Sequence, residues 1–222
     1  MDVDEKILFG VDDSETARQA VVTAGALLKD REGFRITLFY GAPDPHISFL
    51  SKLLRRTPTA VEEYRKVLSL QEHRVLERAV EALIGSGFDP DRVTIRGEGK
   101  CHDPAETMLQ LAAADETETI ALARSSTPRL ERMLMGSVTY RLVHSADEKA
   151  IWVIEAPIAS HDVLVALVSA PISRRVMEHN VRYFAHSRES RFTFFHVVKP
   201  LPPQYWDNTR ILMEQERKER EM

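Results

Sequence analysis

Short apolar runs alternate with stretches of helical periodicity along the chain, and this alternation predicts an α/β fold. Residues 6–11 form one apolar run, and residues 33–43 form another that is rich in β-branched and aromatic side chains. Between them, apolar residues recur at helical spacing: Ala17, Ala20, Val21, Ala24, Leu27 and Leu28. Either Asp13 or Ser14 can cap the start of this helix. Strand, helix and strand in this order predict a parallel βαβ unit with a right-handed crossover.

The same alternation continues as far as residue 155. Further strands are predicted at residues 92–97, 118–123 and 149–155, and further helices at residues 60–84, 103–115 and 137–146. The inner face of the long helix is predicted to carry Val67, Leu70, His73, Val75, Leu76, Ala79 and Leu83. Residues 44–59 predict a surface loop with a short basic turn. These elements together predict an open, parallel, five-stranded sheet with helices on both faces.

The last third of the chain repeats the beginning. Ile7 aligns with Val163 and Ile36 with Phe192, both at an offset of 156 (163 − 7 and 192 − 36). The strand–helix–strand pattern therefore recurs without a gap, but it lacks any counterpart of residues 92–155. We therefore expect a complete domain at residues 1–158 and an incomplete βαβ repeat with a charged helix at residues 159–222.

Composition narrows the class of protein. Hydrophobic residues make up 43% and charged residues 29%, and the net charge of −4 disfavours a nucleic-acid binder. The single cysteine, Cys101, excludes an intrachain disulfide, and the apolar runs are too short to span a membrane. The eight histidines show no metal-ligand spacing, so no metal site is expected. We expect a cytoplasmic protein that binds neither nucleic acid nor membrane.

Candidate binding residues follow three of the predicted strands. Asp12 follows the first, Gly41 the second, and Ala123 with Arg124 the fourth. In a parallel sheet these ends share one edge, where ligands bind at the reversal of strand order. A helix starting near Ser137 would direct its unpaired N–H groups toward an anion there.

These residues resemble the universal stress protein family. The resemblance lies in the strand–"VDDSE"–helix start, in "DPAETMLQLA", and in "MLMGSVTYRLVHSADEKAIWVIE"; it covers about residues 4–156. It implies an adenine-nucleotide site for ATP, with Mg²⁺, or for AMP, and it puts Asp12 at the adenine end. The family's G-x2-G-x9-G-[ST] motif falls on Ala123, Ser126, Gly136 and Ser137, so that two of its three glycines are replaced.

Two functions stay open at this stage. The preserved turn at Gly136, Ser137, Val138 and Thr139, with added charge from Arg124, favours a regulatory protein that binds nucleotide at reduced affinity. The lost glycines at Ala123 and Ser126 favour an interaction module of the same fold that has lost its ligand. A slow ATPase or phosphate-transferring enzyme is a third class, less favoured because no catalytic constellation is apparent.

Assembly is predicted from the strand at residues 149–155. We place this apolar strand at a sheet edge, where it needs a partner or a cover. In the family that the chain resembles, this strand pairs across a dimer, or a tandem second domain takes the place of the partner. The predicted second unit lacks the equivalent strand and cannot take that place. We therefore expect a homodimer with Trp152 in or beside the contact.

Overall fold

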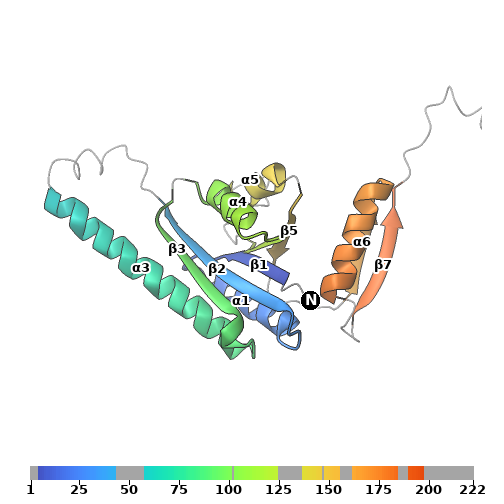
Figure 1. Ribbon diagram of the computed structural model, residues 1–222, viewed down its shortest axis with the longest axis horizontal. Helices are drawn as coiled ribbons and strands as arrows, with labels where there is room; N and C mark the ends of the chain where they lie inside the picture. The colour runs from blue at the N-terminus through green and yellow to red at the C-terminus, as the bar shows by residue number, and fades with distance from the viewer. Residues whose placement is uncertain are drawn as a thin grey trace, which may run out of the picture. The chain divides into compact units, whose positions relative to one another are not determined.

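The computed structural model describes residues 5–43, 58–101, 103–124, 137–146, 148–155, 162–184 and 190–197. The chain divides into two compact units, Met1–Ala159 and Ser160–Met222 (Figure 1). Each unit has its own sheet.

The first unit alternates strands and helices as expected. Its elements are β1 (Glu5–Gly10), α1 (Glu15–Leu28), β2 (Phe34–Pro43), α3 (Pro58–Gly85), β3 (Val93–Cys101), α4 (Pro104–Ala114), β4 (Thr119–Ala123), α5 (Ser137–Ser145) and β5 (Ala150–Ile154). All strands pair in parallel in the order β3-β2-β1-β4-β5. This confirms the predicted five-stranded sheet and the edge position of the fifth strand, and it shows that the first and fourth strands are neighbours.

Helices cover both faces of this sheet. In Figure 1, α4 and α5 lie on one side, and α1 and α3 on the other. On the α4–α5 side, Leu8 and Phe39 of the sheet pack with Met108 and Ala112 of α4 and Leu142 of α5. Burial of these apolar side chains holds the helices against the strands.

The caps of two helices follow the sequence signals. Ser14 caps α1, since its hydroxyl accepts a hydrogen bond from the backbone N–H of Ala17 at 3.1 Å. Asp103 caps α4, and Pro104 occupies the first helical position, where its missing N–H has no cost. Asp13 and Ser14 were the two candidates for the N-cap of α1, and Ser14 is the residue that caps it.

The predicted inner face of α3 is partly wrong. Leu68, Val75, Leu76, Ala79 and Leu83 are buried, and their spacing follows one helical stripe. In contrast, Val67 and Leu70 are 58% and 66% exposed, and His73 is exposed. Leu70 lies about 200° around the helix from Leu68, so both cannot face the sheet. The predicted loop over residues 44–59 lies outside the described residues up to residue 57, and α3 already begins at Pro58.

The third strand extends further than expected, since β3 continues to Cys101. β2 reaches Pro43, where its predicted range ends, and its pairing with β3 shifts register between Gly41 and Pro43. Gly41 therefore lies inside a strand and does not follow it. The cause is pairing between β2 and β3, which stabilises backbone that has weak strand propensity on its own.

The second unit contains β6 (Asp162–Leu167), α6 (Ala170–Phe184) and β7 (Arg191–His196), with the two strands parallel. Val163 pairs with Phe192 as Ile7 pairs with Ile36, and the partners are 29 residues apart in both cases (192 − 163 and 36 − 7). The predicted strand–helix–strand pattern is present. That this unit is a second copy of the first domain stays a prediction.

Among the described helices, none combines the length and the apolar character that crossing a membrane requires.

Candidate functional site

A cleft of about 480 Å³ opens at the carboxyl ends of β1, β2 and β4. Such a volume lies in the range of small-molecule sites, and this edge of a parallel sheet is where ligands bind. The loop after β1, the end of β2, one turn of α3, and the starts of α4 and α5 all contribute to the wall. The cleft therefore forms where β1 and β4 lie side by side although more than 100 residues separate them.

Most residues predicted for the site meet in this cleft. Seven of the nine candidates line it: Asp12, Gly41, Ala123, Arg124, Ser137, Val138 and Thr139. The other two, Ser126 and Gly136, lie outside the described residues. The shared location supports the geometric part of the prediction, whereas a binding role for these residues stays a prediction.

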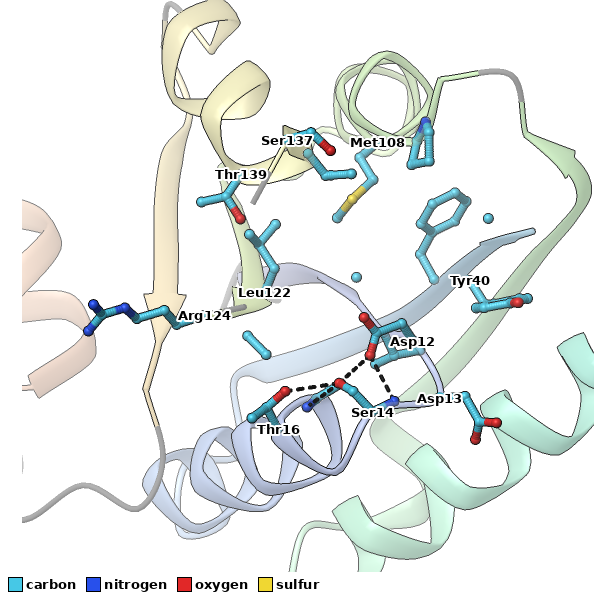
Figure 2. A pocket seen from close by; sticks show the side chains of 18 of the residues that line it. Asp12, Asp13, Ser14, Thr16, Tyr40, Met108, Leu122, Arg124, Ser137 and Thr139 are labelled. Carbon is cyan, nitrogen blue, oxygen red and sulfur yellow. Dashed lines mark hydrogen bonds between the residues drawn. The ribbon is translucent and has the colours of Figure 1, made fainter. Parts of the chain in front are cut away.

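Asp12 is fixed by the start of α1. Its Oδ1 accepts hydrogen bonds from the backbone N–H of Ser14, at 3.0 Å, and from the Ser14 hydroxyl. The same hydroxyl caps α1 through Ala17, so the three residues form one network. Figure 2 shows the other carboxylate oxygen of Asp12 directed toward the cavity. One oxygen thus orients the side chain and the second remains available to a ligand.

Two arginines near the cleft are paired with carboxylates. Arg78 of α3 forms an ion pair with Asp13 at 3.0 Å, which joins α3 to the loop after β1. The Arg124 guanidinium pairs with Glu155, beyond the end of β5. In Figure 2 the Arg124 side chain extends away from the cavity. The predicted contact of this guanidinium with phosphates would therefore require it to leave Glu155.

The amino end of α5 is the part of the cleft that best suits an anion. Ser137 begins this helix and is exposed, and Val138 and Thr139 line the cleft beside it. The first-turn N–H groups of a helix lack intrahelical partners, and the helix dipole places partial positive charge there. This end of the cleft suits a phosphate or carboxylate.

The inner wall of the cleft is apolar and closely packed. Met108 of α4 contacts Gly10, where an added Cβ would lie 2.8 Å from the methionine Cε. At Gly41 an added Cβ would lie 2.9 Å from the Sγ of Cys101, which is buried behind it. Burial also raises the pKa of the Cys101 thiol above its ordinary value. Both glycines therefore keep backbone close to side chains of the core, and Met108 and Leu122 provide an apolar floor.

Ala123, which stands where the family motif has its first glycine, has no backbone strain. Ala123 ends β4 in regular pairing with Ile154 of β5. Among the described residues, Glu116 is the non-glycine residue with positive φ, and Ala123 is not. Alanine therefore fits this position at no conformational cost.

Several cleft residues were not among the predicted site. Thr16, Tyr40, Gln71, Pro104, Met108 and Leu122 also line the cavity. Tyr40 and Leu122 immediately precede predicted residues, and Pro104 marks a predicted helix start, so strand and helix ends could have indicated them. Gln71 and Met108 lie within helices, and the tertiary packing of α3 and α4 brings them to the cleft. Within the described ranges, no three His, Cys, Asp or Glu side chains converge as metal ligands would.

Comparisons with known proteins agree with this fold. The model of the universal stress protein family matches residues 5–151. A universal stress protein from Archaeoglobus fulgidus DSM 4304 aligns with a TM-score of 0.61 at 15% identity, over 98% of this chain and 74% of that one. The hypothetical protein MJ0577 aligns with a TM-score of 0.53 at 20% identity, over 71% of this chain and 99% of that one.

A third structure carries a ligand. It is a universal stress protein from Archaeoglobus fulgidus in complex with dAMP, with a TM-score of 0.47 at 14% identity, over 69% of this chain and 99% of that one. A search of curated proteins gave no match. At these identities the structural likeness establishes the fold alone.

Proposed function

Because the chain belongs to the universal stress protein family, we propose that it is a regulatory protein that binds an adenine nucleotide, ATP or AMP, at reduced affinity. The observation that supports this is the convergence of Asp12, Gly41 and the start of α5 on one cleft of about 480 Å³. The amino end of α5 suits the phosphate groups of a nucleotide, and the apolar residues of the cleft suit its base.

Each part of the cleft has a role in this proposal. The N–H groups at the start of α5 and the Ser137 hydroxyl hold the phosphates, and the preceding Gly136 lets the backbone approach them. The unbonded oxygen of Asp12 accepts a hydrogen bond from the base or the ribose. Phe39, Met108 and Leu122 offer apolar surface to the base. With ATP, a bound Mg²⁺ would neutralise part of the phosphate charge, in a cleft that the carboxylates of Asp12 and Asp13 also line.

The reduced affinity is assigned to the loop between β4 and α5. Ala123 fits its position without strain, so the cost falls on Ser126 if that residue needs positive φ. Such a conformation costs a non-glycine residue about 1–2 kcal/mol, or roughly tenfold in affinity. The double variant Ala123→Gly/Ser126→Gly should therefore bind more tightly than the natural chain.

Isothermal titration calorimetry with ATP and AMP, with and without Mg²⁺, tests the proposal. For the natural chain we expect binding heat at micromolar to millimolar nucleotide concentrations. In Gly136→Val this heat should be lost. The matched control is Gly33→Val, because a Cβ at Gly33 meets no atom within 4 Å. No heat at millimolar nucleotide would leave the second candidate, an interaction module without ligand, which the replaced glycines favour.

We also propose that the protein acts as a homodimer. β5 pairs with β4 on one side and is the edge of the sheet, and Val153 on it is 37% exposed. Pairing of two such edges would cover backbone groups and apolar side chains together, with Trp152 in or beside the contact. Sedimentation at micromolar concentration tests this, and a monomer of about 25 kDa would refute it. A cytoplasmic location stays a prediction from the sequence.

A further inference from the structure

Asp103 is placed to act on two helices at once. Its Oδ1 caps α4, accepting hydrogen bonds from the backbone N–H groups of Ala105 at 3.2 Å and Glu106 at 3.4 Å. Its Oδ2 forms an ion pair with Arg141 of α5. The Asp103 side chain is only 10% exposed, so this carboxylate is held by defined partners in place of water. A single buried side chain therefore connects the first turn of α4 to α5.

Arg141 lies one helical turn after Ser137, the residue that begins α5 at the phosphate end of the cleft. Residues four apart on a helix lie on the same side of it. Restraint at Arg141 therefore acts on the side of α5 that carries Ser137. Pro104, next to Asp103, also lines the cleft, so the ion pair lies beside the wall that it connects.

The ion pair is not needed to keep α5 on the sheet. Leu142 is fully buried in the core cluster, and Val138 packs against that cluster. The Arg141 side chain is 59% exposed, and half-exposed ion pairs add little to stability. Apolar packing sets where the helix body lies but leaves rotation and tilt about that contact. A charge-assisted bond in a defined direction can restrict these movements.

We infer that the Asp103–Arg141 ion pair positions the amino end of α5 for the phosphate groups of the bound nucleotide. Both residues act through the helix and touch no ligand, so they are positioning residues. The inference rests on the proposed nucleotide-binding function and adds a specific demand to it. Breaking the pair should lower the affinity of each ligand in proportion to its contact with α5. It should not change the contribution to affinity of ligand groups that lie elsewhere in the cleft.

The test compares ATP with adenosine in calorimetric titrations of the full chain. Asp103→Asn keeps a cap of equal quality on α4, because asparagine and aspartate are equally good N-caps, and weakens the pair. Arg141→Gln removes the pair from the other side. Arg96→Gln, at an exposed position on β3, is the matched control for loss of an arginine. Far-ultraviolet circular dichroism checks that each variant keeps its helices.

We expect both pair variants to bind ATP about twofold to fivefold more weakly, the range that a helix terminus contributes to an anion, and to bind adenosine unchanged. The double variant should be no weaker than either single variant, since both remove the same contact. Arg141→Lys, which keeps the charge, should recover part of the loss.

Three outcomes would overturn the inference while leaving a cleft that binds ligand. An equal loss for ATP and adenosine would mean a general structural role, and unchanged ATP affinity would mean no role. If the natural protein binds adenosine and ATP with equal affinity, the phosphates contribute nothing to binding. In that case α5 is not the phosphate end, although the cleft still binds nucleosides. If the natural protein binds neither ligand, the proposed function itself fails and this inference falls with it.

Discussion

Replacing Asp12 separates the structural role of its carboxylate from its role toward a ligand. Asp12→Ala removes the acceptor of two hydrogen bonds, from the backbone N–H and from the hydroxyl of Ser14. Such bonds contribute about 0.5–1.5 kcal/mol each, and these two are exposed, so that the low end applies. We expect a loss of about 1 kcal/mol. Asp12→Asn keeps the Oδ1 acceptor and should lose less than about 0.5 kcal/mol.

Urea denaturation at neutral pH, followed by circular dichroism, measures these differences. A third variant, Ser14→Ala, removes the cap on Ala17 and should cost about 1 kcal/mol by itself. In Asp12→Ala/Ser14→Ala the losses should not add, because both substitutions break one network. If Asp12→Asn is as unstable as Asp12→Ala, the Oδ1 acceptor does not hold the loop and the reasoning is refuted.

Nucleotide titration of the same two variants then tests the ligand role. The oxygen directed toward the cavity carries charge in aspartate and is absent in alanine, whereas asparagine keeps at most a neutral group there. Both variants should therefore lose affinity, although Asp12→Ala loses more stability than Asp12→Asn. Retention of full affinity by Asp12→Ala would exclude Asp12 from the binding site.

Three further predictions concern stability. Burial first, and the carboxylate of Glu98 second, raise the pKa of Glu72 above its ordinary value of 4.5, so its contribution to stability is fully present below pH 4.5 and is lost as the pH rises through the raised pKa. Thermal melts between pH 4 and 7 should therefore show the Tm of Glu72→Gln rising relative to that of the natural chain as the pH increases, and a constant difference would contradict this. Lys149 donates from its Nζ to the backbone carbonyl groups of Ala112, in the last turn of α4, at 3.3 Å and of Thr117, just beyond α4, at 2.7 Å. Lys149→Met should therefore cost about 1–2 kcal/mol in urea denaturation, and an unchanged midpoint would contradict this. Gly41→Ala places a Cβ 2.9 Å from the Cys101 Sγ and should cost about 1–3 kcal/mol, part of which Cys101→Ala should restore if this contact is the cause.

The local features of this protein could be predicted from the sequence. Ser14 and Asp103 act as helix caps, and the strands at the start of the chain and at residues 149–155 lie within a residue or so of where periodicity placed them. These features depend on neighbours within one or two turns, which the sequence states directly. The location of the candidate site could also be predicted from the sequence. Residues at the carboxyl ends of parallel strands share one edge of the sheet whatever the details of packing.

The tertiary structure alone decided which side chains meet. It selected the face of α3 that carries Leu68 over the one that carries Leu70, because a long helix with apolar residues on several sides can pack in more than one rotation. It also paired Arg124 with Glu155 and brought Gln71 to the cleft. These contacts join residues that are far apart in the chain, and no local pattern encodes them. Which residues come into contact is determined only when the sheet has formed and the helices have packed against it.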